Sequence, residues 1–232
     1  MDLKEPFSLP SEGKIYSKNI TGEYTIRAPR LRDKGIGDLR LKNKVQSECL
    51  KKCLDPTPEI DPYDWHTSDY TAANLAQRMA AKGKIMPLIV KCQCGNSEEI
   101  EVDLSTLKVT KPKLPLDLEY ETSSGDKLQL KFFTPRILDS IRTNTEKFKE
   151  EYPEATQDVS LQETCRLIID TVNGQKLPFS QMTNYLLDSY EVDLYGIIDK
   201  VFSTNFGPVL LQTRKCSRCG KEISFTVSPD NG

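Results

Sequence analysis

Two cysteine pairs, each followed by a glycine and a short alternating strand, constrain this sequence more than any other feature. The first lies in "VKCQCGNSEEIEVDL", residues 90–104, and the second in "RKCSRCGKEISFTV", residues 214–227. Both run as a basic residue, two cysteines, a glycine, a polar turn and a strand. A structural zinc ion takes four ligands in a tetrahedron. The two segments therefore predict one zinc site, with the ligands Cys92, Cys94, Cys216 and Cys219.

The spacing of the first pair leaves alternatives open. Cys216 and Cys219 have the C-x-x-C spacing of a zinc-ribbon knuckle, whereas Cys92 and Cys94 are one residue closer together. One alternative is that the first pair belongs to a strand and binds no metal; another is that packing alone holds the site. A redox role for C-x-x-C is less expected, because that motif opens a helix in thioredoxin-like units and a strand follows here.

The other three of the seven cysteines are expected to be buried thiols. Cys165 falls on the apolar face of a predicted helix. Cys49 and Cys53 are four residues apart and share a helix face, with a second metal pair as the alternative. Disulfides are not expected, because the opening "MDLKEPFSLP" lacks the apolar run of a secretory signal and indicates a reducing compartment.

The chain also carries a degenerate internal repeat. "GEYTIRAPRLRDKGIGDL", from Gly22, and "GDKLQLKFFTPRILDSI", from Gly125, share a glycine turn, a strand, a Pro-Arg pair and an aspartate three residues later. These aspartates are Asp33 and Asp139. Proline fits the first turn of a helix, so each Pro-Arg pair predicts a strand-to-helix junction. The match is short, so chance similarity is the alternative.

The pattern predicts an α+β fold with two degenerate strand–helix–knuckle halves and small antiparallel hairpins, joined at a zinc-ribbon-like cysteine site. The predicted parts are an N-terminal arm (1–21), a first half (22–108), a proline-rich linker (109–117) and a second half (118–232). The arm either orders against a partner or folds back on its own domain. Helices are predicted at 67–83, 160–174, 180–190 and 191–203, and strands at 84–91, 99–104, 116–122, 127–133, 208–215 and 222–227.

The sequence favours no enzymatic activity. It contains no nucleophile elbow, P-loop, dinucleotide-binding fingerprint or H-E-x-x-H motif. Its one histidine, His66, is expected at a helix start or in the core, with metal binding as the minor alternative. Four thiolates on one zinc ion would leave no position for a catalytic water.

Charge makes nucleic acid an improbable partner. The formal net charge is −2, although residues 27–44 contain seven Lys or Arg against two Asp. This basic stretch lacks the interleaved aromatic residues that stack on bases. It is expected to be a solvated face or a docking face for an acidic protein. A zinc-ribbon regulator that binds nucleic acid remains the alternative function. The longest apolar run, "IMPLIV", is too short to cross a bilayer, so no membrane contact is expected.

Three segments resemble the small baseplate-hub proteins of T-even-type (T4-like) contractile-tailed phages. They are "FSLPSEGKIYS" followed by "GEYTIRAPRLRDK", the stretch from Thr67 to Leu104, and "FGPVLLQTRKCSRCGKEISFTV" near the C-terminus. The resemblance implies a subunit or assembly factor of the baseplate hub that contacts other phage tail proteins and has no enzymatic activity. It also implies a place in the host cytoplasm during assembly, or in the baseplate of the virion tail.

Overall fold

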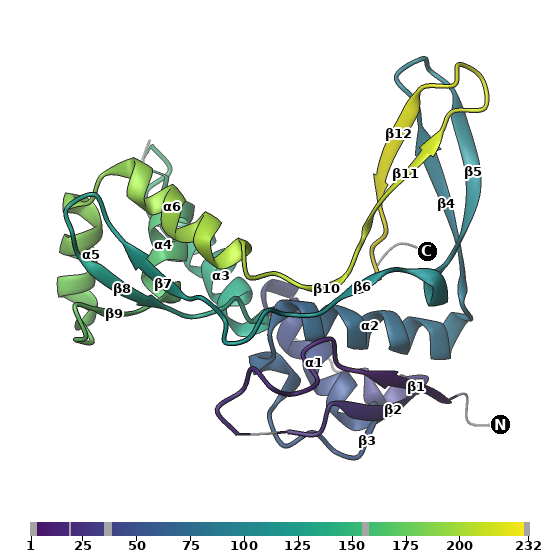
Figure 1. Ribbon diagram of the computed structural model, residues 1–232, viewed down its shortest axis with the longest axis horizontal. Coiled ribbons are helices and arrows are strands. Elements are labelled where there is room, and N and C mark those ends of the chain that lie inside the picture. Colours follow the sequence, from purple (N-terminus) through teal and green to yellow (C-terminus); the bar gives the residue numbers. More distant parts are fainter. Residues whose placement is uncertain (1–3, 19, 35–38, 155–157, 230–232) are drawn as a thin grey trace.

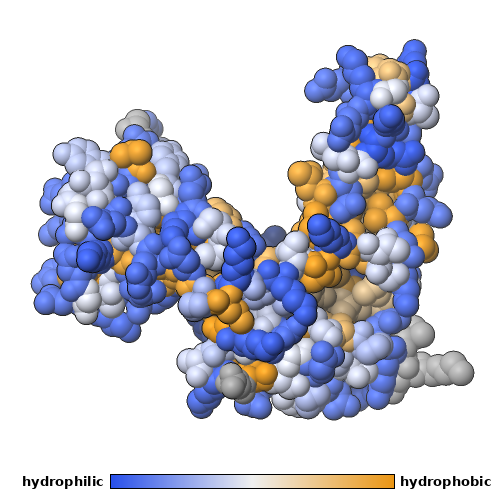
Figure 2. Space-filling model, viewed as in Figure 1, coloured by the Kyte–Doolittle hydropathy of each residue, from blue (hydrophilic) through white to orange (hydrophobic). Residues whose placement is uncertain are grey.

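The computed structural model describes residues 4–18, 20–34, 39–154 and 158–229. Figure 1 shows three parts. An N-terminal unit (residues 4–82) and a C-terminal unit (residues 118–206) lie side by side. A stem of two long hairpins (residues 84–110 and 207–227) projects from the region where the two units meet. Figure 2 shows a wide hollow between the stem and the C-terminal unit, with apolar surface along the stem.

The N-terminal unit is a three-stranded antiparallel sheet packed against two helices. The sheet has the order β1 (Lys4–Ser8), β2 (Glu23–Arg27), β3 (Leu54–Asp55). The helices are α1 (Lys42–Cys53) and α2 (Thr67–Lys82), with 3-10 turns at Leu31–Asp33, Leu39–Leu41 and Pro62–Asp64. Their apolar faces meet in a core that includes Ile26, Leu50, Trp65 and Ala73.

Residues 4–16 belong to this unit and do not form a separate arm. β1 pairs with β2 from Lys4↔Arg27 to Ser8↔Glu23, and Leu9 and Tyr16 lie in the core. Of the two alternatives for this segment, the structure shows the one in which it folds back on its own domain. The proline in "KEPFS" disfavours a strand in the sequence pattern. An edge strand nevertheless tolerates proline where its missing N–H would face solvent.

The C-terminal unit pairs a second three-stranded sheet with four helices. The sheet has the order β7 (Glu119–Glu121), β8 (Lys127–Leu130), β9 (Ile169–Val172). The helices are α3 (Pro135–Glu151), α4 (Val159–Ile168), α5 (Phe179–Asp188) and α6 (Glu191–Phe202). Leu128, Cys165, Ile168, Ile197 and Val201 lie in its core.

The helix predicted at 160–174 is wrong at both ends. It begins one residue earlier, because the Asp158 side chain caps it by accepting from the backbone N–H of Leu161. It stops at Ile168, and the next four residues form β9 on the edge of β8. Three of those four residues are β-branched and favour a strand once a partner edge is present.

The same order of elements occurs in both units. Each has a hairpin, then a helix that runs directly into a third strand, which pairs with the second strand of the hairpin. A further helix and a stem hairpin follow, and the C-terminal unit has α3 and α5 as additional helices. α1 passes into β3 after Cys53, and α4 passes into β9 after Ile168. This order supports the predicted repeat at the level of topology.

A closer match between the two units is a buried aspartate at the third position of the last helix before the stem hairpin. Asp69 of α2 accepts hydrogen bonds from the backbone and hydroxyl of Ser11 and from the Tyr16 hydroxyl. Asp193 of α6 accepts the same three kinds of bond, from the backbone and hydroxyl of Ser123 and from the Tyr120 hydroxyl. In each unit, the aspartate ties the loop of the first hairpin to the helix that precedes the stem.

The aspartates of the predicted Pro-Arg repeat are not equivalent in the structure. Asp33 caps its own 3-10 turn, accepting from the Arg30 backbone and from Arg27. Asp139, fully buried in α3, instead joins the two units, accepting from the Asn43 side chain at 2.8 Å and from the Lys44 backbone at 3.0 Å.

The stem combines the hairpin that follows the N-terminal unit with the hairpin that follows the C-terminal unit. β4 (Ile85–Lys91) pairs with β5 (Ser97–Asp103), and β11 (Leu211–Lys215) pairs with β12 (Glu222–Thr226). At its base, β6 (Val109–Thr110) pairs with β10 (Gly207–Pro208), so the predicted linker begins with a short strand. A 3-10 turn, Leu104–Thr106, separates β5 from β6. The predicted boundaries at 22–108 and 118–232 stay a prediction.

Candidate metal centre

The four candidate cysteines lie at the two turns that close the far end of the stem. In the first turn, the Cys92 backbone N–H donates to the Asn96 carbonyl and the Gly95 N–H donates to the Cys92 carbonyl. In the second, the Cys216 N–H donates to Lys221 and the Gly220 N–H donates to Cys216. Gly95 and Gly220 have φ of 81° and 71°, a conformation that glycine adopts without strain. The first turn is thus the second turn shortened by one residue, which accounts for its C-x-C spacing.

The four sulfur atoms gather at one point. All of them lie within 4.8 Å of one another. The Cys92 and Cys219 sulfurs are 3.6 Å apart, and the Cys94 and Cys216 sulfurs are 3.8 Å apart. A zinc ion bound at about 2.3 Å from each sulfur requires S···S distances of about 3.8 Å. A disulfide would require about 2.05 Å. The donor set and its spacing therefore fit one tetrahedral metal ion.

Polar side chains hold the two turns together. Glu98 of β5 accepts from the backbone N–H of Ser217 at 2.8 Å and from its hydroxyl at 2.9 Å. Arg214 lies 3.4 Å from the same carboxylate. The Asn96 amide donates to the Cys216 sulfur at 3.7 Å. Such outer contacts orient metal ligands. They were missed from the sequence, where the only signal is that Asn96 and Glu98 directly follow the first cysteine pair.

The surroundings of the cluster lower the pKa of one cysteine, Cys216, and raise that of another, Cys92. The backbone N–H of Cys219 is the main cause that lowers the pKa of Cys216 to about 7. The backbone N–H of Cys94 lowers the pKa of Cys92, but burial and the other three sulfurs outweigh it and raise this pKa to about 12. A zinc ion requires all four sulfurs as thiolates, so binding would release protons.

Four thiolates would close the coordination sphere, which suits a structural site. Small apolar clusters continue from the sulfurs down the stem, through Val90, Ile100 and Ile223 to Met86, Leu104 and Val227. Two-stranded hairpins are marginally stable alone. A metal at the tip would join the ends of the two hairpins.

The remaining cysteines and the histidine lie elsewhere. Cys49, Cys53 and Cys165 are buried in the cores of the two units, which confirms the prediction of buried thiols. His66 caps α2, where its Nδ1 accepts from the Ser68 backbone at 3.0 Å. This confirms the expected helix start, and the cysteine cluster includes no histidine.

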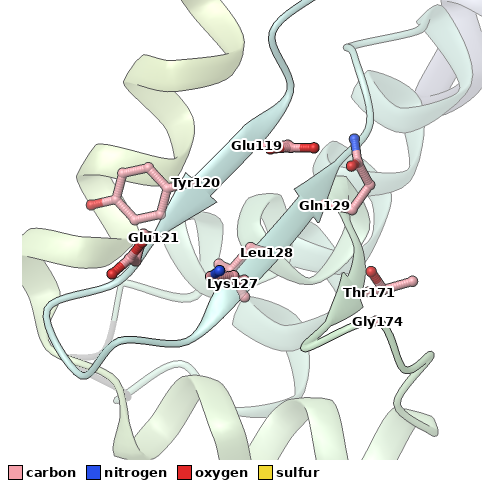
Figure 3. A pocket seen from close by; sticks show the side chains of 8 residues that line it. All are labelled: Glu119, Tyr120, Glu121, Lys127, Leu128, Gln129, Thr171 and Gly174. Carbon is pink, nitrogen blue, oxygen red and sulfur yellow. The ribbon is translucent and has the colours of Figure 1, made fainter.

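A hollow of about 450 Å³ lies on the sheet of the C-terminal unit. Its lining comes from β7, β8 and the end of β9, and Figure 3 shows the side chains spread along the strands. Glu119 and Gln129 lie near one another, and Glu121 lies further along β7 (Figure 3). The charged groups do not converge on one point, so the cysteine cluster is the stronger candidate site.

Comparison with known families decides the class of protein. Residues 8–230 match the family described as T4 bacteriophage base plate protein. The chain belongs to this family. The match covers nearly the whole chain of the base plate protein, from the end of β1 through the stem, and confirms the resemblance to T4-like baseplate proteins. No curated protein and no solved structure matches the chain. Among the described residues, no helix has the length and apolar character needed to span a membrane.

Proposed function

We propose that this base plate protein is a structural subunit or assembly factor of the baseplate hub of a contractile-tailed phage. The observation that carries the proposal is the family match over residues 8–230. The family implies contacts with other phage tail proteins, and the hub is the part of the baseplate to which the sequence resemblance points. The protein acts through these contacts in the host cytoplasm during assembly, or in the finished tail, and catalyses no reaction.

The proposal includes one structural Zn²⁺ ion bound by Cys92, Cys94, Cys216 and Cys219. The S···S distances and the contacts from Asn96 and Glu98 support it. The ion would fix the angle between the β4–β5 and β11–β12 hairpins. Since each unit contributes one hairpin, the metal would tie together segments more than a hundred residues apart and present the stem as one rigid element.

Co-expression and particle analysis test the hub proposal. The tagged full-length chain is expressed with the other baseplate proteins of its phage, and those that co-purify are identified by mass spectrometry. We expect at least one hub protein to be retained after washing at 0.5 M salt, and the chain to be found in purified particles or in hub intermediates. If the intact chain retains no tail protein but binds DNA or RNA with steep salt dependence, the alternative of a nucleic-acid-binding regulator replaces the hub proposal.

A further inference from the structure

The outer side of helix α6 carries exposed apolar side chains although its inner side already fills the core. Leu194, Ile197 and Val201 are buried in the C-terminal unit. On the opposite side, Val192 is 69% exposed and Tyr195 is 50% exposed. Asp199 lies on this same side, four residues after Tyr195 and seven after Val192, so apolar and acidic side chains share the exposed side of α6.

The apolar surface continues into the end of α5. Leu187, in the last turn of α5, is 54% exposed, and Tyr190, directly before α6, is 64% exposed. We call these four residues, Leu187, Tyr190, Val192 and Tyr195, the α5–α6 patch. Figure 1 places α5 at the end of the C-terminal unit that is far from the N-terminal unit, and α6 runs from that end back toward β10. Clustered exposed apolar residues of this kind mark interaction sites.

The exposed charged residues within and beside the patch are acidic. Asp188, Glu191 and Asp199 are exposed and have no ion-pair partner among the described residues. The nearby Lys200 is engaged with Asp117 at 2.5 Å. Asp188 is the last residue of α5, where the helix dipole disfavours a negative charge, so helix stability does not account for it.

We propose that the α5–α6 patch binds an amphipathic segment of another tail protein, with apolar residues three or four apart and flanking Lys or Arg. This inference rests on the proposed function, which supplies tail proteins as partners. The acidic rim disfavours nucleic acid and anionic lipid surfaces, which are themselves negative. It favours a basic segment, whose charges complement the rim while its apolar residues cover Val192 and Tyr195.

A second copy of this chain is the competing occupant. The exposed basic stretch around Arg32 carries Leu31, which is 87% exposed. However, Leu31 is a single apolar side chain in a three-residue 3-10 turn. It would leave most of a four-residue patch uncovered, so the partner protein accounts for the patch better.

The test uses the full-length chain and the tail protein with which it co-purifies. One variant, Val192→Gln with Tyr195→Gln, removes the apolar contact from side chains whose loss costs the fold little. A second, Asp188→Lys with Asp199→Lys, reverses the charge of the rim. The matched control, Glu150→Lys with Glu151→Lys, makes the same charge change at the exposed end of α3. We expect each patch variant to weaken binding by at least about tenfold, and the control to bind as the parent does.

A photo-crosslinking residue at position 195 identifies the occupant. We expect cross-links to a partner peptide that has the stated apolar spacing and flanking basic residues. Unchanged binding by both patch variants, or cross-links only to a second copy of this chain, would overturn the inference. A parent chain that binds no tail protein contradicts the proposed function instead, so the two failures are distinguishable.

Discussion

His66, at the start of α2, packs against two segments of the chain that flank the C-terminal helices. One precedes α3 and the other follows α6. Its ring is 5.1 Å from that of Phe132 and 4.4 Å from that of Phe206, measured between centroids. Nδ1 accepts from the Ser68 backbone, so the neutral ring carries its hydrogen on Nε2, which has no hydrogen-bond partner among the described residues. Burial lowers the pKa of His66 to about 4.

This pKa predicts a loss of stability in mild acid. As the pH falls through the ordinary histidine value of 6.5, the unfolded chain takes up a proton and the folded chain does not. The free energy of unfolding should fall by about 2 kcal/mol between pH 7 and pH 5 from this group. We expect His66→Asn, which keeps a capping side chain, to be less stable at pH 7.5 but to lose less stability over this range.

Urea unfolding at a series of pH values measures this effect. Asp69, whose pKa burial raises, is present in both proteins, and its contribution cancels in the comparison. Parallel pH profiles for the parent and His66→Asn would show that the histidine is not the source of the acid sensitivity.

The paired aspartates Asp69 and Asp193 give a second prediction at this scale. Asp69→Ala would leave the buried Ser11 and Tyr16 donors unpaired, which should lower the free energy of unfolding by about 3 kcal/mol. Asp193→Ala should cost about 1 kcal/mol, because Ser123 is exposed and can bond to water. Chemical denaturation checks both values. Equal losses for the two variants would contradict this difference in burial.

At the scale of elements, the sequence predicted the helices and strands that are determined by neighbouring residues in the chain. α2 and α6 follow from their spacing and end residues, and both stem hairpins follow from strand alternation around a cysteine turn. β1 and β9 were missed because each depends on a neighbour: "KEPFS" becomes a strand on the edge of β2, and residues 169–172 leave the helical pattern to pair with β8. Tertiary pairing overrides local preference at both places.

The pairing of β1 predicts that the N-terminal segment is part of the fold. Deletion of residues 1–16 removes β1, Leu9 and Tyr16 from the core and takes the donors from Asp69. We expect a loss of more than about 4 kcal/mol in the free energy of unfolding. Deletion of residues 1–3, which keeps all of these contacts, is the control. A truncated chain that melts with the parent would show that the segment does not stabilise the unit.

At the scale of the whole molecule, the cysteine cluster forms only when two distant hairpins meet. The sequence predicted the four cysteines as one group, since each pair supplies half of a tetrahedral ligand set. Glu98, Asn96 and Ser217 could not be predicted, because their contacts depend on how the hairpins cross in space. Two-stranded hairpins are marginally stable alone, so the proposed zinc ion would stabilise the stem.

The zinc content of the full-length protein tests the central claim most directly. Protein expressed without added metal and purified without chelators is measured by elemental analysis, beside a Cys216→Ser variant and a Cys165→Ser control whose cysteine lies in the C-terminal core. We predict about one equivalent of zinc per chain in the parent and the control. The Cys216→Ser variant should lose the metal and melt at a lower temperature. A metal-free parent whose melting temperature is unchanged by chelators would contradict the account.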